Sequence, residues 1–351
     1  MRIATFNVKN LTKPGNRIYS SSNPLYTEGE YAEKTWWIGQ RILEMDADVI
    51  GFQEIWEVET LIDCLREVGL ENEYDIFGRD APNRFAVQVA TMVRKGTARS
   101  DAIWHTEFPE GARFLKRRTE RTTYHMDVQI DNFSRSVLEL RVKPKRRGAS
   151  EIVFFNAHLK SKRPIDLDRT EADKLPFEDE QAIGSALSNV RRSAEAAALR
   201  MLLNDRMLGN DEPVVVLGDL NDDYLSVSTT IVTGDPSYKL FEKSRVGSRA
   251  SKSADLGLYA AQMLKQYRSL RNVHYTHIFK NRIEVLDHIL VSEQFYDHSL
   301  KREWSFRDAL YFNDHLEDHA NSKVTTDHGI VLAIFDYDPI EKVIKEAAAN
   351  V

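Results

Sequence analysis

The chain has 351 residues, 42% of them hydrophobic and 29% charged, and its formal net charge is −6. This composition excludes a disordered or fibrous protein and allows a sizeable buried core. The longest strongly apolar stretch, residues 330–335, is far shorter than the roughly 18 residues that a membrane-spanning helix requires. The single cysteine, Cys64, excludes an intrachain disulfide and a cysteine zinc cluster, and its apolar neighbours predict that it is buried.

Strands dominate the elements that hydrophobic periodicity predicts. Residues 2–8 alternate like a short strand, and residues 31–45 place apolar side chains at helical spacing. The compact apolar run at 47–53 predicts a buried strand, and residues 57–68 predict a second short helix. Further strands are predicted at 86–94, 136–142, 151–157, 213–217, 284–291 and 329–335.

The longest predicted helix covers residues 181–208. It carries an apolar stripe, and three arginines on the opposite face. The stripe consists of Ile183, Leu187, Val190, Ala194, Ala197 and Met201, and the arginines are Arg191, Arg192 and Arg200. The stretches 12–29, 160–180 and 234–256 are rich in Pro, Gly, Ser or charge and are predicted as loops.

Together these elements predict an α+β protein in which two packed sheets have helices outside. We expect a single catalytic domain over residues 1–338, followed by a helical tail at 339–351. The 16 glycines add an exclusion, because the closest two are nine positions apart. That spacing rules out the dinucleotide-binding fingerprint, the phosphate-binding P-loop and the G-x-S-x-G nucleophile motif.

Polar side chains lie at the ends of six predicted strands. Any single one of these residues is explained equally well as a turn residue or a strand cap. If the strands lie side by side, however, their ends converge on one edge of the fold. The residues are the carboxylates Glu54, Asp219, Asp287 and Asp327, the amides Asn7 and Asn221, and the imidazoles His158 and His328.

This inventory points to a chemistry. Oxygen ligands without cysteine suit a hard divalent cation, Mg²⁺ or Mn²⁺, held by one or two carboxylates and several waters. The imidazoles then remain free to donate to a phosphate. The set therefore predicts metal-assisted hydrolysis of a phosphate ester.

Six short motifs also occur in the order found in one family. They are TFNVKNL at 5–11, QE at 53–54, NAHL at 156–159, GDLND at 218–222, LDHIL at 286–290 and TDH at 326–328. With these motifs the chain resembles the endonuclease/exonuclease/phosphatase superfamily, including its deoxyribonucleases and abasic-site endonucleases. The resemblance implies a four-layer αββα sandwich of two mixed sheets with the site at one edge. The superfamily also contains inositol phosphatases and sphingomyelinases, so the substrate stays open.

The resemblance implies a role for each motif residue. Asn7 and Glu54 resemble the metal-site pair, and Asp327 resembles a further direct or water-mediated ligand. Asp219 resembles the residue that orients and deprotonates the attacking water, with Asn221 assisting it. The remaining roles concern the phosphate: His328 contacts it, Asp287 holds the ring of His328, and His158 donates to a second phosphate oxygen.

Candidate substrate contacts lie outside these motifs. Arg135 is our choice for the phosphate-binding residue in the middle of the chain. Lys160 and Lys162 come from one of three basic runs, which cover residues 113–121, 143–147 and 160–163. Two positions depart from the family pattern, since His288 replaces a common aromatic residue and Thr326 replaces a common serine.

Other side chains invite rival interpretations. His315 and His319 are four residues apart, but no glutamate directly follows the first histidine, which argues against a zinc motif. His274 and His277 are expected near the substrate groove or the surface. Trp36 and Trp37 resemble base-stacking platforms, but the periodicity of their helix predicts that both are core residues.

Three functional hypotheses follow. The first is a Mg²⁺-dependent nuclease whose partner is DNA or RNA, which the basic runs and Arg191 and Arg192 favour. The second is an enzyme of the same chemistry that acts on a small phosphorylated metabolite or a lipid headgroup, and the third is a non-catalytic binding protein. The sequence predicts no exposed aromatic hairpin for membrane docking, and it indicates no protein partner. No secretory signal is evident at residues 1–10, so we expect a cytoplasmic protein.

Overall fold

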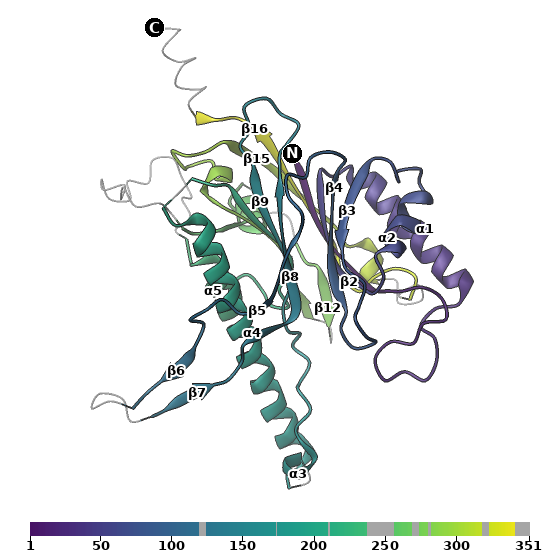
Figure 1. The fold of residues 1–351 in the computed structure, drawn as a ribbon, viewed down its shortest axis with the longest axis vertical. Helices are drawn as coiled ribbons and strands as arrows, with labels where there is room; N and C mark the ends of the chain where they lie inside the picture. Colours follow the sequence, from purple (N-terminus) through teal and green to yellow (C-terminus); the bar gives the residue numbers. More distant parts are fainter. Residues whose placement is uncertain are drawn as a thin grey trace.

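The computed structural model describes residues 1–118, 124–172, 174–209, 211–236, 256–268, 274–279, 282–317 and 323–340. Two six-stranded sheets pack face to face, and helices cover the outer faces of both sheets (Figure 1). Both sheets are mixed, because each contains parallel and antiparallel pairs. This arrangement confirms the predicted α+β class and the four-layer αββα sandwich.

The first sheet has the order β15-β16-β1-β2-β4-β3, with β1 and β2 parallel at its centre. Two helices, α1 and α2, cover its outer face (Figure 1). The bounds are β1 Arg2–Leu11, α1 Glu28–Met45, β2 Val49–Ile55, α2 Glu59–Arg66, β3 Tyr74–Gly78, β4 Gln88–Arg94, β15 Trp304–Phe312 and β16 Ile330–Tyr337.

The second sheet has the order β11-β14-β10-β9-β8-β5, with β9 and β10 parallel at its centre. The long helix α4 and the short helix α5 lie on its outer side (Figure 1). The bounds are β5 Ile103–Glu107, β8 Asn132–Val142, β9 Ile152–His158, α4 Phe177–Met207, β10 Val214–Asp219, α5 Val227–Thr233, β11 Tyr259–Ala260, α6 Ala261–Arg268 and β14 Asp287–Val291. Smaller elements are β6 Phe114–Lys116, β7 Met126–Val128, α3 Arg169–Ala172, β12 His277–Phe279 and β13 Arg282–Glu284.

The side chains of β1 point alternately into two cores, which helps to hold the layers together. Ile3 belongs to the core between the two sheets, whereas Ala4, Phe6 and Val8 belong to the core beneath α1 and α2. Successive side chains of a strand point to opposite faces, so this one strand contributes to two cores. The side chain of Asn7 lies on the same face of β1 as that of Ile3, so its amide points into the space between the sheets. At this residue β1 reaches the edge of the sandwich.

Two parallel pairs bring four strand ends to one edge of the sandwich. The pair β1 and β2 ends near Asn7 and Glu54, and the pair β9 and β10 ends at His158 and Asp219. Gly218 makes the last step of β10 possible, because its φ is +142° and a Cβ there would lie 1.9 Å from the carbonyl oxygen of Ala157. The polar ends predicted from the sequence therefore do converge.

A buried polar network joins the sheets directly below this edge. The Nε2 of Gln53 donates to Oδ1 of Asn156 at 2.8 Å, and the Nδ2 of Asn156 donates to the carbonyl oxygen of Ala90 at 2.8 Å. Gln53 is 0% exposed and Asn156 is 1% exposed. Satisfied buried polar groups fix the register of a core more specifically than apolar contacts do. Two residues of the family-like motifs therefore serve the packing of the sheets.

The predicted apolar stripe of α4 lies on the wrong face of the helix. Ile183, Leu187 and Val190 are exposed, Ala197 and Met201 are only half-buried, and Ala194 alone is buried. The buried face instead carries polar side chains beside the apolar ones, and Arg192, which is 5% exposed, donates to Asp222. Periodicity failed here because buried polar side chains with partners interrupt the apolar face.

Other expectations have mixed outcomes. Trp36 is 51% exposed, so its assignment to the core is wrong, while Trp37 packs against the core beneath α1. Cys64 is buried as predicted. The stretch predicted as a loop at 160–180 contains the short helix α3 and the start of α4.

Parts of the chain lie outside the described residues. These include most of the predicted loop at 234–256, Arg121, His319 and residues 341–351 of the expected tail, so the predicted division into a domain and a tail stays a prediction. Within the described part of the chain, no helix combines the length and the apolar character that a transmembrane segment needs.

Candidate active site

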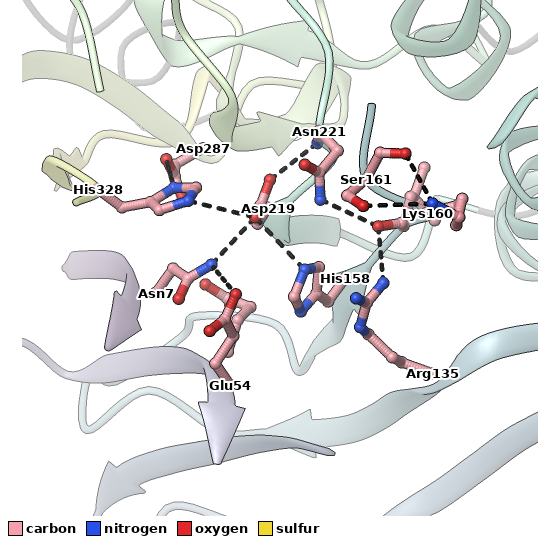
Figure 2. A network of polar contacts seen from close by, with 12 residues as sticks. Asn7, Glu54, Arg135, His158, Lys160, Ser161, Asp219, Asn221, Asp287 and His328 are labelled. Carbon is pink, nitrogen blue, oxygen red and sulfur yellow. Dashed lines mark hydrogen bonds and ion pairs between the residues drawn. The ribbon is translucent and has the colours of Figure 1, made fainter. Parts of the chain in front are cut away.

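Asp219 is the centre of the polar cluster at the edge of the sandwich (Figure 2). Its Oδ2 accepts a hydrogen bond from Nδ2 of Asn7 at 3.0 Å and lies 3.4 Å from Nε2 of His158 and 3.8 Å from Nε2 of His328. Its Oδ1 accepts the backbone N–H of Asn221 at 2.8 Å. Residues from both sheets thus surround one buried carboxylate.

Asn7 and Glu54 form the side of the site that belongs to the first sheet. The Nδ2 of Asn7 also donates to Oε1 of Glu54 at 3.3 Å, and the backbone N–H of Asn10 donates to Oε2 of Glu54 at 2.9 Å. Lys9 donates its backbone N–H to Oδ1 of Asn7 at 3.0 Å. These contacts turn the amide oxygen and the carboxylate toward the edge.

The backbone is strained at this edge. Lys9, Asn10, Tyr19, Glu54 and Asn221 all have φ between +53° and +67°. Residues other than glycine adopt this region uncommonly and at a cost in energy, and such residues tend to cluster at functional sites. Among the described residues other than glycine, only Asp46 and Asp235 share the conformation elsewhere.

His328 is held from two directions. Its Nδ1 lies 2.9 Å from Oδ2 of Asp287, and its backbone N–H donates to Oγ1 of Thr326 at 3.2 Å. Thr326 in turn donates to the backbone carbonyl of Asn7 at 2.8 Å. The Asp287–His328 pair expected from the resemblance is therefore present, and Nε2 of the ring faces Asp219 (Figure 2). Threonine replaces the common serine without loss of this contact.

The charges of these groups depend on one another. Burial raises the pKa of Asp219 to about 7, and the neighbouring Asp287 adds to this effect, while His328 opposes it. Burial alone would lower the pKa of His328, but the carboxylates of Asp287 and Asp219 raise it well above its usual value. The protonated form of His328 is accordingly favoured by the two acidic side chains that enclose it.

His158 has the opposite character. Burial lowers its pKa well below the usual value, and the nearby Arg135 and His328 lower it further. The ring is therefore neutral at pH 7, its Nε2 is directed at Asp219, and its buried Nδ1 has no hydrogen-bond partner in the described structure. A neutral imidazole beside an imidazolium gives the site two donors of different acidity.

Asp327 lies beside this cluster on the surface. Its carboxylate is half exposed and forms an ion pair with Nζ of Lys9 at 3.5 Å. A different set, Asp219, Asp287 and His328, brings its ligand atoms within 4.8 Å of one another and could also hold a metal ion.

The three predicted substrate contacts behave differently. Arg135 lies beside His158, and its guanidinium donates to the carbonyl oxygen of Leu159 at 3.1 Å, with no carboxylate partner among the described residues (Figure 2). Lys160 directs Nζ at oxygens of Ser161 and Arg163, the nearest at 2.9 Å. Lys162 is neutralised by Glu284 at 2.7 Å.

Several residues at the site were not predicted from the sequence. The Nζ of Lys34, a residue that is 0% exposed, donates to the carbonyl oxygen of Thr325 at 2.7 Å and so holds the segment that leads to His328. Thr276 accepts the backbone N–H groups of Leu286 and Asp287 at 2.9 and 3.2 Å. The Lys34 contact has no local sequence signal because its partner is 291 residues away, and the Thr276 contacts span 10 and 11 residues with no motif that marks them.

Two histidines considered in the sequence lie next to this cluster. The ring of His277 is 5.2 Å from that of His328, as expected for a residue near the substrate groove. The Nε2 of His315 lies 2.9 Å from the backbone carbonyl of His328, which is a supporting contact.

The basic runs are divided between the two ends of the sandwich. Residues 143–147 follow β8 at the end opposite to the site, because Val142 pairs with Ile152 at the start of β9. The run at 113–118 lies on the hairpin of β6 and β7, which projects from the end that carries the site (Figure 1). Arg191 and Arg192 pair with Glu195 and Asp222 and are already neutralised.

That hairpin also corrects an expectation. Leu115, Tyr124 and Met126 are exposed on or beside its strands, so the inference that the chain has no exposed aromatic hairpin is wrong. The sequence missed it because its strands have only three residues each. A lipid headgroup therefore remains a substrate to be tested.

The class of protein that this fold and site define is a hydrolase built on an αββα sandwich. The family model described as Endonuclease/Exonuclease/phosphatase family matches residues 4–328, so the chain belongs to this family. Its members hydrolyse phosphate esters, generally with a divalent metal ion. No curated protein sequence matches the chain.

Solved structures share the fold at low sequence identity. A mannosyl-6-phosphatase of Bacteroides thetaiotaomicron is 16% identical with a TM-score of 0.53, and the match covers 96% of this chain and 100% of that one. The human Nocturnin catalytic domain is 15% identical with a TM-score of 0.53, with 96% and 94% covered. Caenorhabditis elegans TDP2 is 12% identical with a TM-score of 0.52, with 96% and 97% covered. These matches confirm the fold.

Proposed function

We propose that the protein is a Mg²⁺-dependent phosphodiesterase whose substrate is a nucleic acid or a nucleotide. The observation that carries the proposal is the buried carboxylate of Asp219, which lies among Asn7, His158 and His328 with a pKa raised to about 7. A base with a pKa near the working pH combines the right protonation state with sufficient driving force.

The metal would lie on the side of Asn7, Glu54 and Asp327. Their amide and carboxylate oxygens are the donors that Mg²⁺ prefers, and Mn²⁺ accepts the same ligands. The alternative set includes His328, which would have to release its proton to bind a cation, whereas the oxygens of Asn7, Glu54 and Asp327 need no such step. When bound, the cation would polarise an oxygen of the substrate phosphate.

The remaining residues would handle the water and the phosphate. Oδ2 of Asp219 orients the attacking water and takes its proton, and the Asn221 backbone N–H fixes the carboxylate through Oδ1. The imidazolium of His328, positioned by Asp287, donates from Nε2 to a phosphate oxygen. His158 donates to a second oxygen, and both bonds strengthen as charge develops in the transition state.

The unpaired charge beside the cluster supports an extended anionic substrate. Arg135 has no carboxylate partner among the described residues and is suited to a phosphate oxygen, since a guanidinium matches that geometry. The Lys160 and Lys162 side chains would shape the loop beside it. One structural neighbour is a mannosyl-6-phosphatase, and this makes a small phosphomonoester the second candidate substrate.

A substrate panel tests this proposal. Hydrolysis is measured with Mg²⁺, Mn²⁺ or EDTA on plasmid DNA, abasic duplex, single strands, RNA, nucleotides, inositol phosphates, sugar phosphates and sphingomyelin. We expect metal-dependent hydrolysis of phosphodiesters that is lost in Asp219→Asn. Hydrolysis restricted to sugar phosphates or to sphingomyelin would contradict the nucleic-acid proposal, and no hydrolysis by the wild type would contradict the catalytic one.

A further inference from the structure

We propose that Tyr19 stacks on a nucleobase of the substrate and so makes the site selective for base-bearing phosphoesters. This inference rests on the phosphoesterase function proposed above and names its substrate class. Tyr19 lies in the segment between β1 and α1, which the sequence predicts only as a polar loop. Tyr19 is 38% exposed, whereas Ile18, which precedes it, is buried.

The tyrosine is tied to the metal side of the site through a single residue. Its hydroxyl donates to Oδ1 of Asn10 at 3.2 Å, and Nε1 of Trp56 donates to the same oxygen at 3.2 Å. The backbone N–H of Asn10 donates to Oε2 of Glu54 at 2.9 Å. A substrate phosphate close to Glu54 would therefore have its sugar and base within reach of the Tyr19 ring.

A small separate core holds the ring in place. Ile18, Trp56 and Val87 are buried together in a cluster apart from the three main cores. Tyr19 packs edge-on against Trp56, with ring centroids 5.3 Å apart and an interplanar angle of 85°. Its backbone N–H donates to the carbonyl oxygen of Arg84 at 2.6 Å. An aromatic side chain fixed before binding loses little conformational entropy when a ligand stacks on it.

The strained backbone supports a functional role for this position. Tyr19 has a φ of +53°, a region that a bulky residue without special constraint avoids. The small separate core and the hydrogen bond to the carbonyl oxygen of Arg84 together hold this conformation in place. Strain that persists at a partly exposed aromatic residue beside a polar cluster favours a role in binding over a role in packing.

The Tyr19 hydroxyl is uncharged at neutral pH. Burial raises its pKa to about 12, the carboxylate of Glu54 raises it further, and Arg135 and Arg163 oppose these effects. The ring therefore offers a neutral aromatic surface to a base.

The chemistry of the ring favours a base over a sugar or an acyl chain. The Tyr19 hydroxyl already donates to Asn10, so what it presents to a ligand is mainly ring surface. Every base has a flat π-face that stacks on an aromatic ring, whereas a sugar offers only C–H groups to that ring. A lipid tail would require a wider apolar surface than one ring.

The test compares substrates that differ only in the base. One pair is the methyl phosphodiesters of thymidine 5′-phosphate and 2-deoxyribose 5-phosphate, and the other is a thymidine dinucleotide and its analogue without one base. Kinetics with Mg²⁺ are combined with calorimetric binding in EDTA for the wild type, Tyr19→Leu, Tyr19→Phe and the control Trp36→Leu. Trp36 is a comparably exposed aromatic residue on α1.

We expect the wild type to prefer the base-bearing member of each pair. Tyr19→Leu should raise KM for that member about 5- to 100-fold, the range that stacking contributes per base, and leave the base-free member unchanged. Tyr19→Phe keeps the ring and should retain most of the preference. Trp36→Leu should behave like the wild type.

Two results separate this inference from the proposed function. If the wild type hydrolyses both members of each pair equally well, the stacking inference is wrong while the phosphoesterase stands, and this comparison needs no variant. If the wild type hydrolyses neither member but binds the base-bearing one more tightly, and Tyr19→Leu abolishes that difference, the stacking stands and the catalytic proposal falls. Equal losses on both members in Tyr19→Leu would also overturn the inference.

Discussion

The Nδ2 of Asn7 donates to Oδ2 of Asp219 at 3.0 Å, and this contact crosses from one sheet to the other. Asn7 belongs to β1 and Asp219 ends β10, so the sandwich must close correctly before the acidic centre exists. The same amide nitrogen reaches Glu54 at 3.3 Å. The site is thus a property of the interface between two sheets, which links its chemistry to the register of the fold.

The first prediction concerns Asp219. Asp219→Asn removes the proposed base while keeping the size of the side chain, and kcat should fall by at least about 10²-fold. In the wild type, activity should rise with pH through about 7 as this carboxylate loses its proton. Rates from pH 5 to 9 at fixed Mg²⁺ measure both effects, with the exposed Asp205→Asn as the control. A mutant that retains the same pH profile would assign the base to another residue.

The second prediction concerns the metal side. Glu54→Gln should lose most activity at low Mg²⁺ and recover partly as Mg²⁺ rises, because a cation with few protein ligands depends strongly on each carboxylate. Titration of Mg²⁺ against rate measures the shift in half-saturation. Glu44→Gln, on the exposed part of α1, is the matched control. An unchanged half-saturation in Glu54→Gln would place the metal elsewhere, with Asp219 and Asp287 as the next ligands to test.

The third prediction treats Asp287 and His328 as one unit. His328→Ala should lower kcat by about 10²-fold or more, and Asp287→Asn should act through the imidazole that it holds at 2.9 Å. The double variant should then be little worse than His328→Ala alone, because residues that act together have non-additive effects. Additive losses in this double-mutant cycle would show that Asp287 acts independently of His328.

The site was largely predictable because its residues end strands. Asp219 and Glu54 each follow an apolar run, and the convergence of parallel strand ends is a general property of such sheets. Lys34 was not predictable because its partner is distant in sequence, whereas Tyr19 and Thr276 act through partners 9 to 11 residues away that no sequence motif marks. The partner of Lys34 at Thr325 is 291 residues away.

The face of α4 could not be read from periodicity for a related reason. The buried face of α4 includes Ser188, Arg192 and Glu195, so the exposed apolar residues give the stronger periodic signal. Arg192 is buried instead, because Asp222 follows the strand that ends at Asp219 and offers it a charge partner. A long-range ion pair of this kind overrides the local pattern.

The fourth prediction concerns the stability contributed by Lys34. Burial lowers its pKa to about 7, and the neighbouring Lys9 contributes. Between pH 7 and about 10.5, the unfolded chain therefore binds more protons at this lysine than the native chain does. The free energy of unfolding should rise with pH in this window by up to about 1.4 kcal/mol per pH unit from this group.

The difference between the wild type and Lys34→Met isolates that contribution. Chemical denaturation at pH 7, 8 and 9 should show the wild type gaining stability relative to Lys34→Met as pH rises. Lys323→Met removes an exposed lysine that pairs with Glu30, and it should show no such trend. A pH-independent difference for Lys34→Met would mean that Lys34 stays protonated in the folded protein.

The last prediction compares basic residues at the two ends of the sandwich. Arg117 and Arg118 lie on the hairpin at the site end, whereas Lys145 and Arg146 lie at the opposite end. If a polynucleotide passes the hairpin, Arg117→Glu/Arg118→Glu should raise KM for DNA and leave kcat nearly intact, because phosphate contacts position the strand. Lys145→Glu/Arg146→Glu makes the same change in net charge and should leave KM unchanged.

Salt dependence decides between local contact and overall charge. Each substrate phosphate that the protein neutralises contributes about −0.7 to −0.9 to the slope of the logarithm of the binding constant against the logarithm of the salt concentration. Arg117→Glu/Arg118→Glu should flatten this slope by about one to two, and Lys145→Glu/Arg146→Glu should leave it unchanged. If both variants shift KM and the slope equally, only the net charge of the protein matters. If neither does, the hairpin does not contact DNA, and a small phosphoester becomes the better candidate substrate.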